Sequence, residues 1–277
     1  MTALVRSELI KAFSTRTAWA MPLAMFLVTA VFTAIGGFFL VYAELPVGGT
    51  TIRARETMDE AVLVRMVYTG ALQMGYLLTL VLGILAMGSE YRHRTLTATL
   101  QAVPRRGRMI LAKVLGLVIV VLLNGLAHLA GALLAGGAVL LSADLSVAPD
   151  TGDLVATMLR LLLVLVLWGL IGFGLGVLIP NQVVALFVGV AVAFIVEPLL
   201  GFGITFWDAV ADAARFFPSQ ATMSTLNIFD GADAATTQAL GGAENPLAWW
   251  ISGLVLQGYA AVMTAFGWLL TARRDVA

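Results

Sequence analysis

Five long stretches of the sequence contain no Asp, Glu, Lys or Arg, and they constrain the fold more than any other feature. Each is apolar and long enough to cross a bilayer, which takes about 20 residues of helix. The chain is 60% hydrophobic and 12% charged, whereas soluble domains carry about a quarter charged residues. The sequence therefore predicts an all-α, polytopic membrane protein and excludes disordered, coiled-coil and nucleic-acid-binding proteins. The uncharged stretches are 17–43, 66–89, 114–143, 161–196 and 245–272.

The stretch 161–196 is too long for one ordinary span, and Pro180, Asn181 and Gln182 interrupt it. Proline removes a helix donor and asparagine favours turns, so we expect two helices joined by a very short loop. This gives six spans in a single transmembrane domain that covers residues 1–277. The expected spans are 18–43, 66–88, 109–141, 154–179, 183–200 and 247–271.

The distribution of Lys and Arg predicts the orientation. With six spans both termini lie on one side, and that side receives most of the 16 cations. Cytoplasmic loops are enriched in Lys and Arg, so we expect cytoplasmic termini and a multi-pass protein of the plasma or inner membrane. The first apolar run exceeds a signal-peptide core of about 7–15 residues, so we expect it to remain as the first span. The cations expected in the cytoplasm are Arg6, Lys11, Arg16, Arg92, Arg94, Arg105, Arg106, Arg108, Lys113, Arg273 and Arg274.

Residues 1–17 are expected to form an amphipathic helix that lies in the membrane interface. Val5, Leu9 and Phe13 recur every four residues and share one helical face, away from the basic residues. Such a helix directs its cations toward anionic lipid headgroups. The alternative is a positively charged anchor and nothing more.

Two segments are expected on the outer side. Residues 44–65 are polar and predict a loop. Within the long outer segment 201–246, residues 206–217 place charged and apolar side chains on opposite faces, which predicts an amphipathic helix that ends before Pro218. A second short helix is expected over 220–229. Two such helices at the outer surface predict a re-entrant hairpin between the fifth and sixth spans.

The sequence contains no motif for nucleotide binding or hydrolytic chemistry. A phosphate loop needs Gly-x-x-x-x-Gly-Lys followed by Ser or Thr, and neither of the two lysines, Lys11 and Lys113, follows glycine. There is no HExxH zinc motif and no G-x-S-x-G elbow, and the chain has no cysteine and two histidines. We therefore expect no enzyme activity and no cofactor or metal site on this chain.

Four polar residues expected at membrane depth are candidates for a translocation path or gate, because such groups are costly there. Glu197 is either a gate or substrate contact, or a structural acid paired with a backbone group or with a cation such as Arg215. Asn124 and His128 lie four residues apart, and they either line a path or hydrogen-bond between helices. Gln73 is a weaker candidate.

The fourth expected span contains Gly172 and Gly176, whose spacing permits two helices to approach closely. We expect these glycines to pack against another helix of the same chain rather than to contact a substrate.

Two segments resemble a known family. The opening RSELIKAFSTRTAW at 6–19 is similar to the start of many actinobacterial permeases of the second type of ATP-binding-cassette (ABC) exporter. The segment GSEYRHRTLTATLQAVPRRGRMILAK at 88–113 resembles their first cytoplasmic loop, with its E-Y-R-H-G-T, T-L, P-R-R and A-K elements; Arg94 stands where glycine is common. Length and span number also fit, so the resemblance covers essentially the whole chain.

The resemblance implies a permease that pairs with a second permease, identical or sibling, and with two ATPase subunits that bind ATP and Mg. In that family the loop corresponding to 89–108 forms a coupling helix seated in a groove of the ATPase. The N-terminal helix helps to clasp the ATPase, and the segment near 199–229 corresponds to re-entrant helices that close the exit. The alternative for 89–108 is a basic loop without a partner. The coupling role carries over to Glu90, Tyr91, Arg92, His93 and Thr95, and to Pro104, Arg105 and Arg106.

Three functions remain open at this point. The first is the permease subunit of an ABC exporter that moves a lipophilic, drug-like or lipid cargo. The second is an ion-gradient-driven transporter or channel that uses Glu197 and His128 as proton carriers. The third is a membrane scaffold or sensor without flux. Membrane lipids surround the chain in all three, and none involves nucleic acid.

Overall fold

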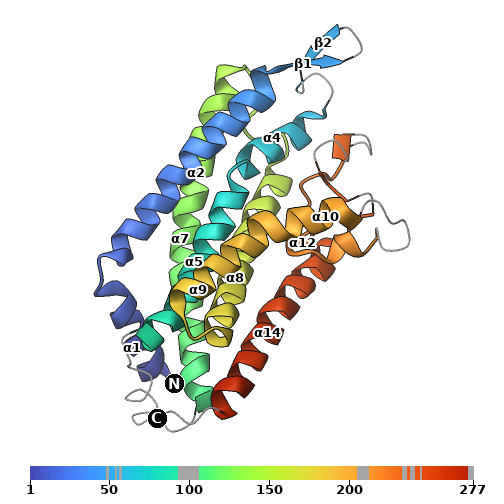
Figure 1. Ribbon diagram of the computed structural model, residues 1–277. Helices are drawn as coiled ribbons and strands as arrows, with labels where there is room; N and C mark the ends of the chain where they lie inside the picture. Colours follow the sequence, from blue (N-terminus) through green and yellow to red (C-terminus); the bar gives the residue numbers. More distant parts are fainter. Residues whose placement is uncertain are drawn as a thin grey trace.

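The computed structural model describes residues 1–47, 50–53, 55, 58–92, 106–204, 212–232, 236–237, 241–243 and 245–273. Six helical segments in this part of the chain are long and apolar enough to cross a membrane, and they form one bundle (Figure 1). The predicted six-span helical membrane fold is therefore confirmed. The spans are α2 (Thr17–Tyr42), α4 (Glu60–Thr69) with α5 (Leu72–Arg92), α7 (Arg106–Ser142), α8 (Thr151–Leu178), α9 (Gln182–Ala191) continued through a π-helical turn (Val192–Val196) into α10 (Glu197–Ile204), and α14 (Trp249–Arg273).

The bundle has two distinct ends (Figure 1). Helix α1 (Thr2–Phe13) lies beside the last turn of α5 and the first turn of α7, and α14 ends nearby. This is the N-terminal end. A small antiparallel hairpin, β1 (Glu44–Val47) and β2 (Thr50–Arg53), marks the opposite, hairpin end. The chain thus enters its first span and leaves its last span at the same end of the bundle, as an even number of spans requires.

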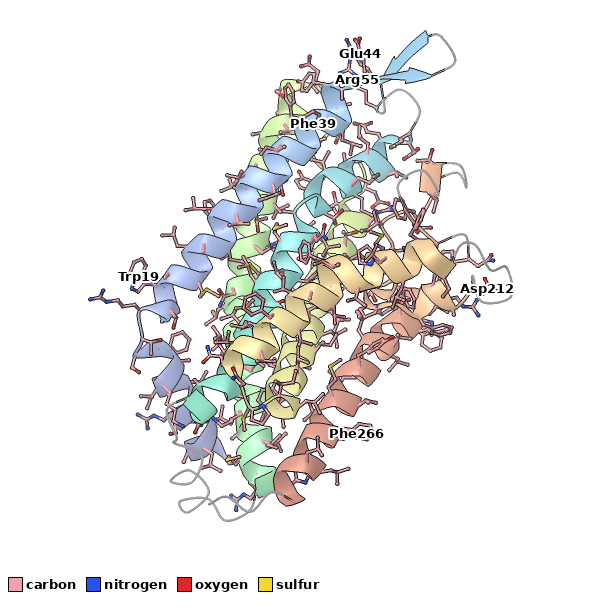
Figure 2. All side chains as sticks on the ribbon, in the orientation of Figure 1. Trp19, Phe39, Glu44, Arg55, Asp212 and Phe266 are labelled. Atoms are coloured by element: carbon pink, nitrogen blue, oxygen red, sulfur yellow. The ribbon has the colours of Figure 1, made fainter. Side chains whose placement is uncertain are left out.

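Apolar side chains cover the outer surface of the bundle. Trp19 and Phe39 of α2 and Phe266 of α14 point away from the neighbouring helices (Figure 2). In water such a surface would be strongly unfavourable, whereas lipid tails solvate it. Helix α1 is present as predicted; Val5 and Leu9 of its apolar stripe are half-buried, and Phe13 is exposed.

The second span begins earlier than predicted. The expected loop 44–65 contains the hairpin and the first part of α4, so Arg65 lies within a helix rather than in a loop. Helix α4 begins at Glu60 because the carboxylate of Asp59 accepts a hydrogen bond from the Ala61 N–H at 2.8 Å and caps it. The prediction placed the start of the span directly after Arg65, because this residue is charged. In the structure Arg65 is buried and paired, so the helix can include it.

Helix α8 is the most buried span: 72% of its apolar window is buried, against 17% for α14. Gly172 of α8 faces the carbonyl of Leu80 in α5, and Gly176 faces the backbone of Ile84 one turn further along. A Cβ atom at either glycine would meet main-chain atoms. The predicted close packing therefore occurs between two helices of this chain.

The segment after the fifth span folds back onto the bundle (Figure 1). Asp212–Phe216 forms a single 3₁₀ turn, while the earlier part of the helix predicted at 206–217 lies outside the described residues. Helix α12 (Pro218–Leu226) follows, slightly earlier than the predicted 220–229, and ends at Asn227 in the left-handed conformation (φ 56°). Helix α12 packs against α8 and α14. Because most of the first arm lies outside the described residues, the re-entrant hairpin stays a prediction.

Replacing Gly172 by alanine is expected to destabilise the bundle, because the new methyl group would push α8 away from the Leu80 carbonyl. Overpacking of this kind costs about 1–3 kcal/mol. The measurement is the free energy of unfolding in mixed micelles. Gly258→Ala is the matched control, since a Cβ there meets nothing within 4 Å; equal stability of the two variants would contradict the packing account.

Candidate functional site

Four ionised side chains meet at the N-terminal end of the bundle. Lys113 of α7 donates hydrogen bonds to Glu8 Oε2 of α1 at 2.9 Å and to Glu90 Oε1 of α5 at 2.8 Å. Lys11 of α1 donates to Glu8 Oε1 at 3.0 Å and to Glu90 Oε1 at 3.2 Å. Glu8, Lys11, Glu90 and Lys113, called the Lys113 cluster below, thus connect three helices.

Pairing makes burial of these charges possible. Lys113 is 3% exposed and Glu90 is 4% exposed, and a buried charge is tolerated only with a partner. The cluster holds two cations and two anions, including both lysines of the chain. Partial burial lowers the pKa of Lys11, but the hydrogen bonds and charges of Glu8 and Glu90 outweigh this effect and raise the pKa above its usual 10.5.

The Lys113 cluster holds the two helices that flank the segment expected to couple to an ATPase. Glu90 is buried within the cluster and does not form an exposed contact surface. Tyr91 and Arg92 form the last residues of α5 and Arg106 the first residue of α7; their side chains are outside the described part. His93, Thr95, Pro104 and Arg105 lie outside the described residues altogether.

Sequence reasoning missed a second buried charge, Arg65, at the hairpin end. Its Nη2 and Nε donate to Asp153 Oδ2 at 2.7 and 3.0 Å. Its Nη1 donates to the carbonyls of Asn227, Ile228 and Asp230 at 2.9, 3.2 and 2.8 Å. With 6% exposure, this arginine ties α4 to α8 and to the turn after α12. One sequence feature could have indicated this role: Arg65 is the single arginine in the mostly apolar stretch that follows Asp59, the residue that caps α4.

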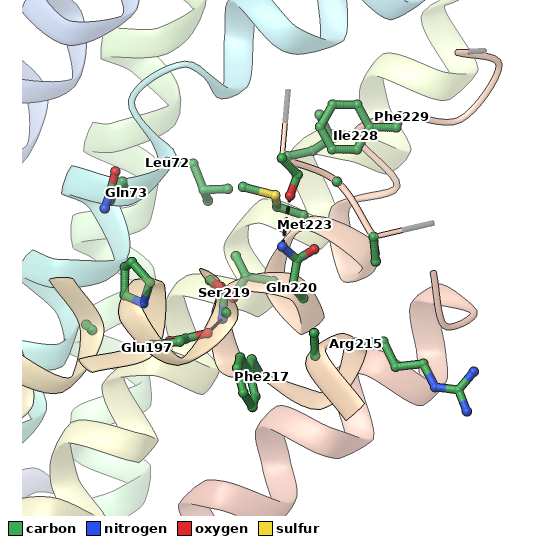
Figure 3. Close-up of a pocket in the computed structure, with 18 of the residues that line it drawn as sticks. Leu72, Gln73, Glu197, Arg215, Phe217, Ser219, Gln220, Met223, Ile228 and Phe229 are labelled. Atoms are coloured by element: carbon green, nitrogen blue, oxygen red, sulfur yellow. Dashed lines mark hydrogen bonds between the residues drawn. The ribbon is translucent and has the colours of Figure 1, made fainter. Parts of the chain in front are cut away.

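A cavity of about 810 Å³ opens between the α4–α5 junction, α10 and α12 (Figure 3). Two predicted gate candidates, Glu197 and Gln73, line it, whereas Asn124 and His128 do not. The geometry thus separates the four membrane-depth candidates into two groups. The apolar side chains that line the cavity include Met66, Leu72, Phe202, Phe217, Met223 and Phe229.

Glu197 is held by a backbone donor. Its Oε1 accepts the N–H of Ser219 in the first turn of α12, where the helix dipole favours a negative charge. This is the backbone pairing considered for Glu197 on sequence grounds. The alternative partner, Arg215, points away from Glu197 and lies over the ring of Phe216, 5.2 Å from its centroid (Figure 3). Glu197 therefore both lines the cavity and fixes the start of α12.

An aromatic pair supports the cavity from the α8 side. Tyr76, which lines the cavity, stacks on Trp168 with ring centroids 4.2 Å apart. The indole Nε1 of Trp168 donates to Thr222 Oγ1 of α12 at 2.8 Å. These two contacts link α5, α8 and α12 next to the cavity, and the stack orients the ring of Tyr76.

Asn124 and His128 lie elsewhere in the bundle, on α7. His128 Nδ1 hydrogen-bonds Thr29 Oγ1 of α2 at 2.7 Å, which joins two helices. Asn124 Nδ2 donates to the carbonyl of Val120 in its own helix at 2.8 Å. Both side chains are buried. These contacts favour the helix-bonding interpretation for His128, and Asn124 bonds within its own helix.

No group of three or more His, Cys, Asp or Glu residues in the described part of the chain could hold a metal ion. No protein-family model matches the sequence, and no curated protein matches it significantly.

Replacing Lys113 by methionine is expected to lower the free energy of unfolding by about 3 kcal/mol or more, because it removes the buried cation that contacts both Glu8 and Glu90. Denaturant titration in mixed micelles measures the loss. Arg108→Met, an exposed cation earlier in the same helix, is the control and should change stability little. A loss no larger than that of the control would show that the cluster does not stabilise the bundle.

Proposed function

We propose that this chain is the permease subunit of an ATP-driven ABC exporter for a lipophilic, drug-like or lipid cargo. The observation that carries the proposal is the segment 88–113, whose sequence resembles the first cytoplasmic loop of that family. The Lys113 cluster supports it, because Lys113 joins the two flanking helices to each other and α7 to α1, and Lys11 joins α1 to α5. If a partner displaces this segment, the movement reaches the rest of the bundle only when the two flanking helices are held in place.

The partners follow from the same resemblance. Two ATPase subunits bind ATP and Mg, and a second permease completes the transport unit. Residues 89–108 face the cytoplasm and seat in a groove of the ATPase, with Tyr91, Arg92, His93 and Thr95 at one end and Pro104, Arg105 and Arg106 at the other. Glu90 acts from within the chain: it fixes the last turn of α5 through Lys113.

Helix α5 connects the two ends of the mechanism. It begins at the cavity, which Leu72 and Tyr76 line, and reaches the Lys113 cluster at Glu90. This part of the helix is about 27 Å long at about 1.5 Å per residue. A displacement of 89–108 by the ATPase would therefore reach the cavity wall through one helix, packed against α8 by the glycine contacts.

The gradient-driven alternative gains no comparable support. It requires Glu197 and His128 to act on one proton path, yet Glu197 lines the cavity while His128 bonds Thr29 between α7 and α2 and is not among the lining residues.

Combined Tyr91→Ala and Arg92→Ala substitution is expected to reduce the ATPase activity stimulated by the permease about tenfold or more, because an aromatic residue and an arginine commonly dominate a protein interface. The assay compares reconstituted complexes with purified ATPase alone. Membrane insertion and the unfolding midpoint of the permease should stay unchanged. Arg55→Ala, near the hairpin end, is the control. Normal stimulation by the double variant would overturn the proposed coupling role.

A further inference from the structure

The cavity combines a buried carboxylate with apolar and aromatic walls. Glu197 is 6% exposed; its carboxylate points toward Ser219 (Figure 3), and Pro198, Phe217 and Met223 line the same cavity. The volume of about 810 Å³ falls within the range of about 300–1,000 Å³ typical of small-molecule sites. Such a pocket holds an organic molecule with an apolar body, and its carboxylate selects the charge of that molecule.

The charges around the cavity leave it net negative. Among the described lining residues, two are acidic, Glu197 and Asp212, and one is basic, Arg215. The guanidinium of Arg215 lies over Phe216 and points away from Glu197 (Figure 3). It therefore does not neutralise the carboxylate inside the pocket.

Glu197 retains capacity for a ligand. Its carboxylate accepts hydrogen bonds from the N–H and the side chain of Ser219, and a carboxylate has about four acceptor positions, so these two bonds do not fill it. A carboxylate in an apolar pocket is stabilised when a cation lies next to it. Burial of a neutral molecule against it brings no such gain, and an anion is repelled.

Aromatic rings add a second preference for positive charge. The ring of Tyr76 lines the cavity and is fixed by its stack on Trp168, and Phe217 lines the same space on the side of α12. The electron-rich face of an aromatic ring attracts cations, and more strongly where water is excluded.

We propose that this cavity is a binding site for a lipophilic organic cation, with Glu197 as its counter-ion and the aromatic and apolar walls holding its body. The proposal rests on the proposed export function only in naming the class of cargo. The fifth span forms one wall of the cavity, where the lining residue Phe202 is itself largely exposed on the surface of the bundle.

The test is equilibrium binding to the purified full chain in lipid nanodiscs, with two probes of the same shape and opposite charge. Tetraphenylphosphonium is expected to bind saturably above empty nanodiscs, and tetraphenylborate is not. Glu197→Gln should weaken tetraphenylphosphonium binding about tenfold or more, because it removes the charge at short range in a poorly solvated site. Glu44→Gln, which removes an exposed carboxylate at the hairpin, should leave binding unchanged.

The variants separate binding from folding. The glutamine of Glu197→Gln keeps a carbonyl oxygen that accepts the Ser219 N–H, so the unfolding midpoint should change little. Gln73→Lys places a cation in the same cavity without touching the α12 cap, and it should weaken tetraphenylphosphonium binding as well. Equal binding of the two probes, or undiminished tetraphenylphosphonium binding in both cavity variants, would overturn the proposal.

The outcome is independent of the ATPase. Binding is measured on the permease alone, so loss of coupling in the Tyr91 and Arg92 variant with intact cation binding bears only on the exporter mechanism. Conversely, normal ATPase stimulation with no charge-selective binding would reject the cation site and leave the exporter proposal standing.

Discussion

Two lysines and two glutamates neutralise one another at the N-terminal end of the bundle, and the arrangement around the segment 93–105 depends on this pairing. Lys113 is almost completely buried, so its charge is tolerated only because Glu8 and Glu90 both accept from it. These contacts attach α7 to α1 and to α5, and the Lys11–Glu90 pair attaches α1 to α5. A loop that takes up force from a partner can transmit it only if its flanking helices do not yield independently.

Arg65 has the corresponding role at the hairpin end, where it binds Asp153 and three carbonyls after α12. Between the two ends, α5 packs on α8 so closely that glycine is required at the contact with Leu80. The Glu197 cavity lies where this rigid pair meets the less buried fifth span and the returning helix α12. The cavity proposed to hold the cargo therefore lies next to the well-packed contact between α5 and α8. Helix α5 contributes to both the cavity wall and this contact.

Hydropathy and proline placement were enough to predict six spans, because a bilayer imposes length and composition on every crossing helix. They did not place Arg65 in a helix, since its partners Asp153 and Asn227 are distant in sequence. For the same reason the Lys113 cluster was not predicted, although Lys11 and Lys113 were counted among the cytoplasmic cations and Glu90 among the coupling residues. Glu197 was identified from its depth, but its bond to the Ser219 N–H follows only from the folded chain.

The central claim is that this chain works with an ATPase through residues 89–108. The most direct measurement is purification of the tagged chain from its native membrane in mild detergent, after crosslinking, with mass spectrometry of the proteins that accompany it. The account predicts a stoichiometric partner that carries a phosphate-loop motif, crosslinked to residues 89–108. Recovery of the chain at full yield with no nucleotide-binding partner, before or after crosslinking, would contradict it.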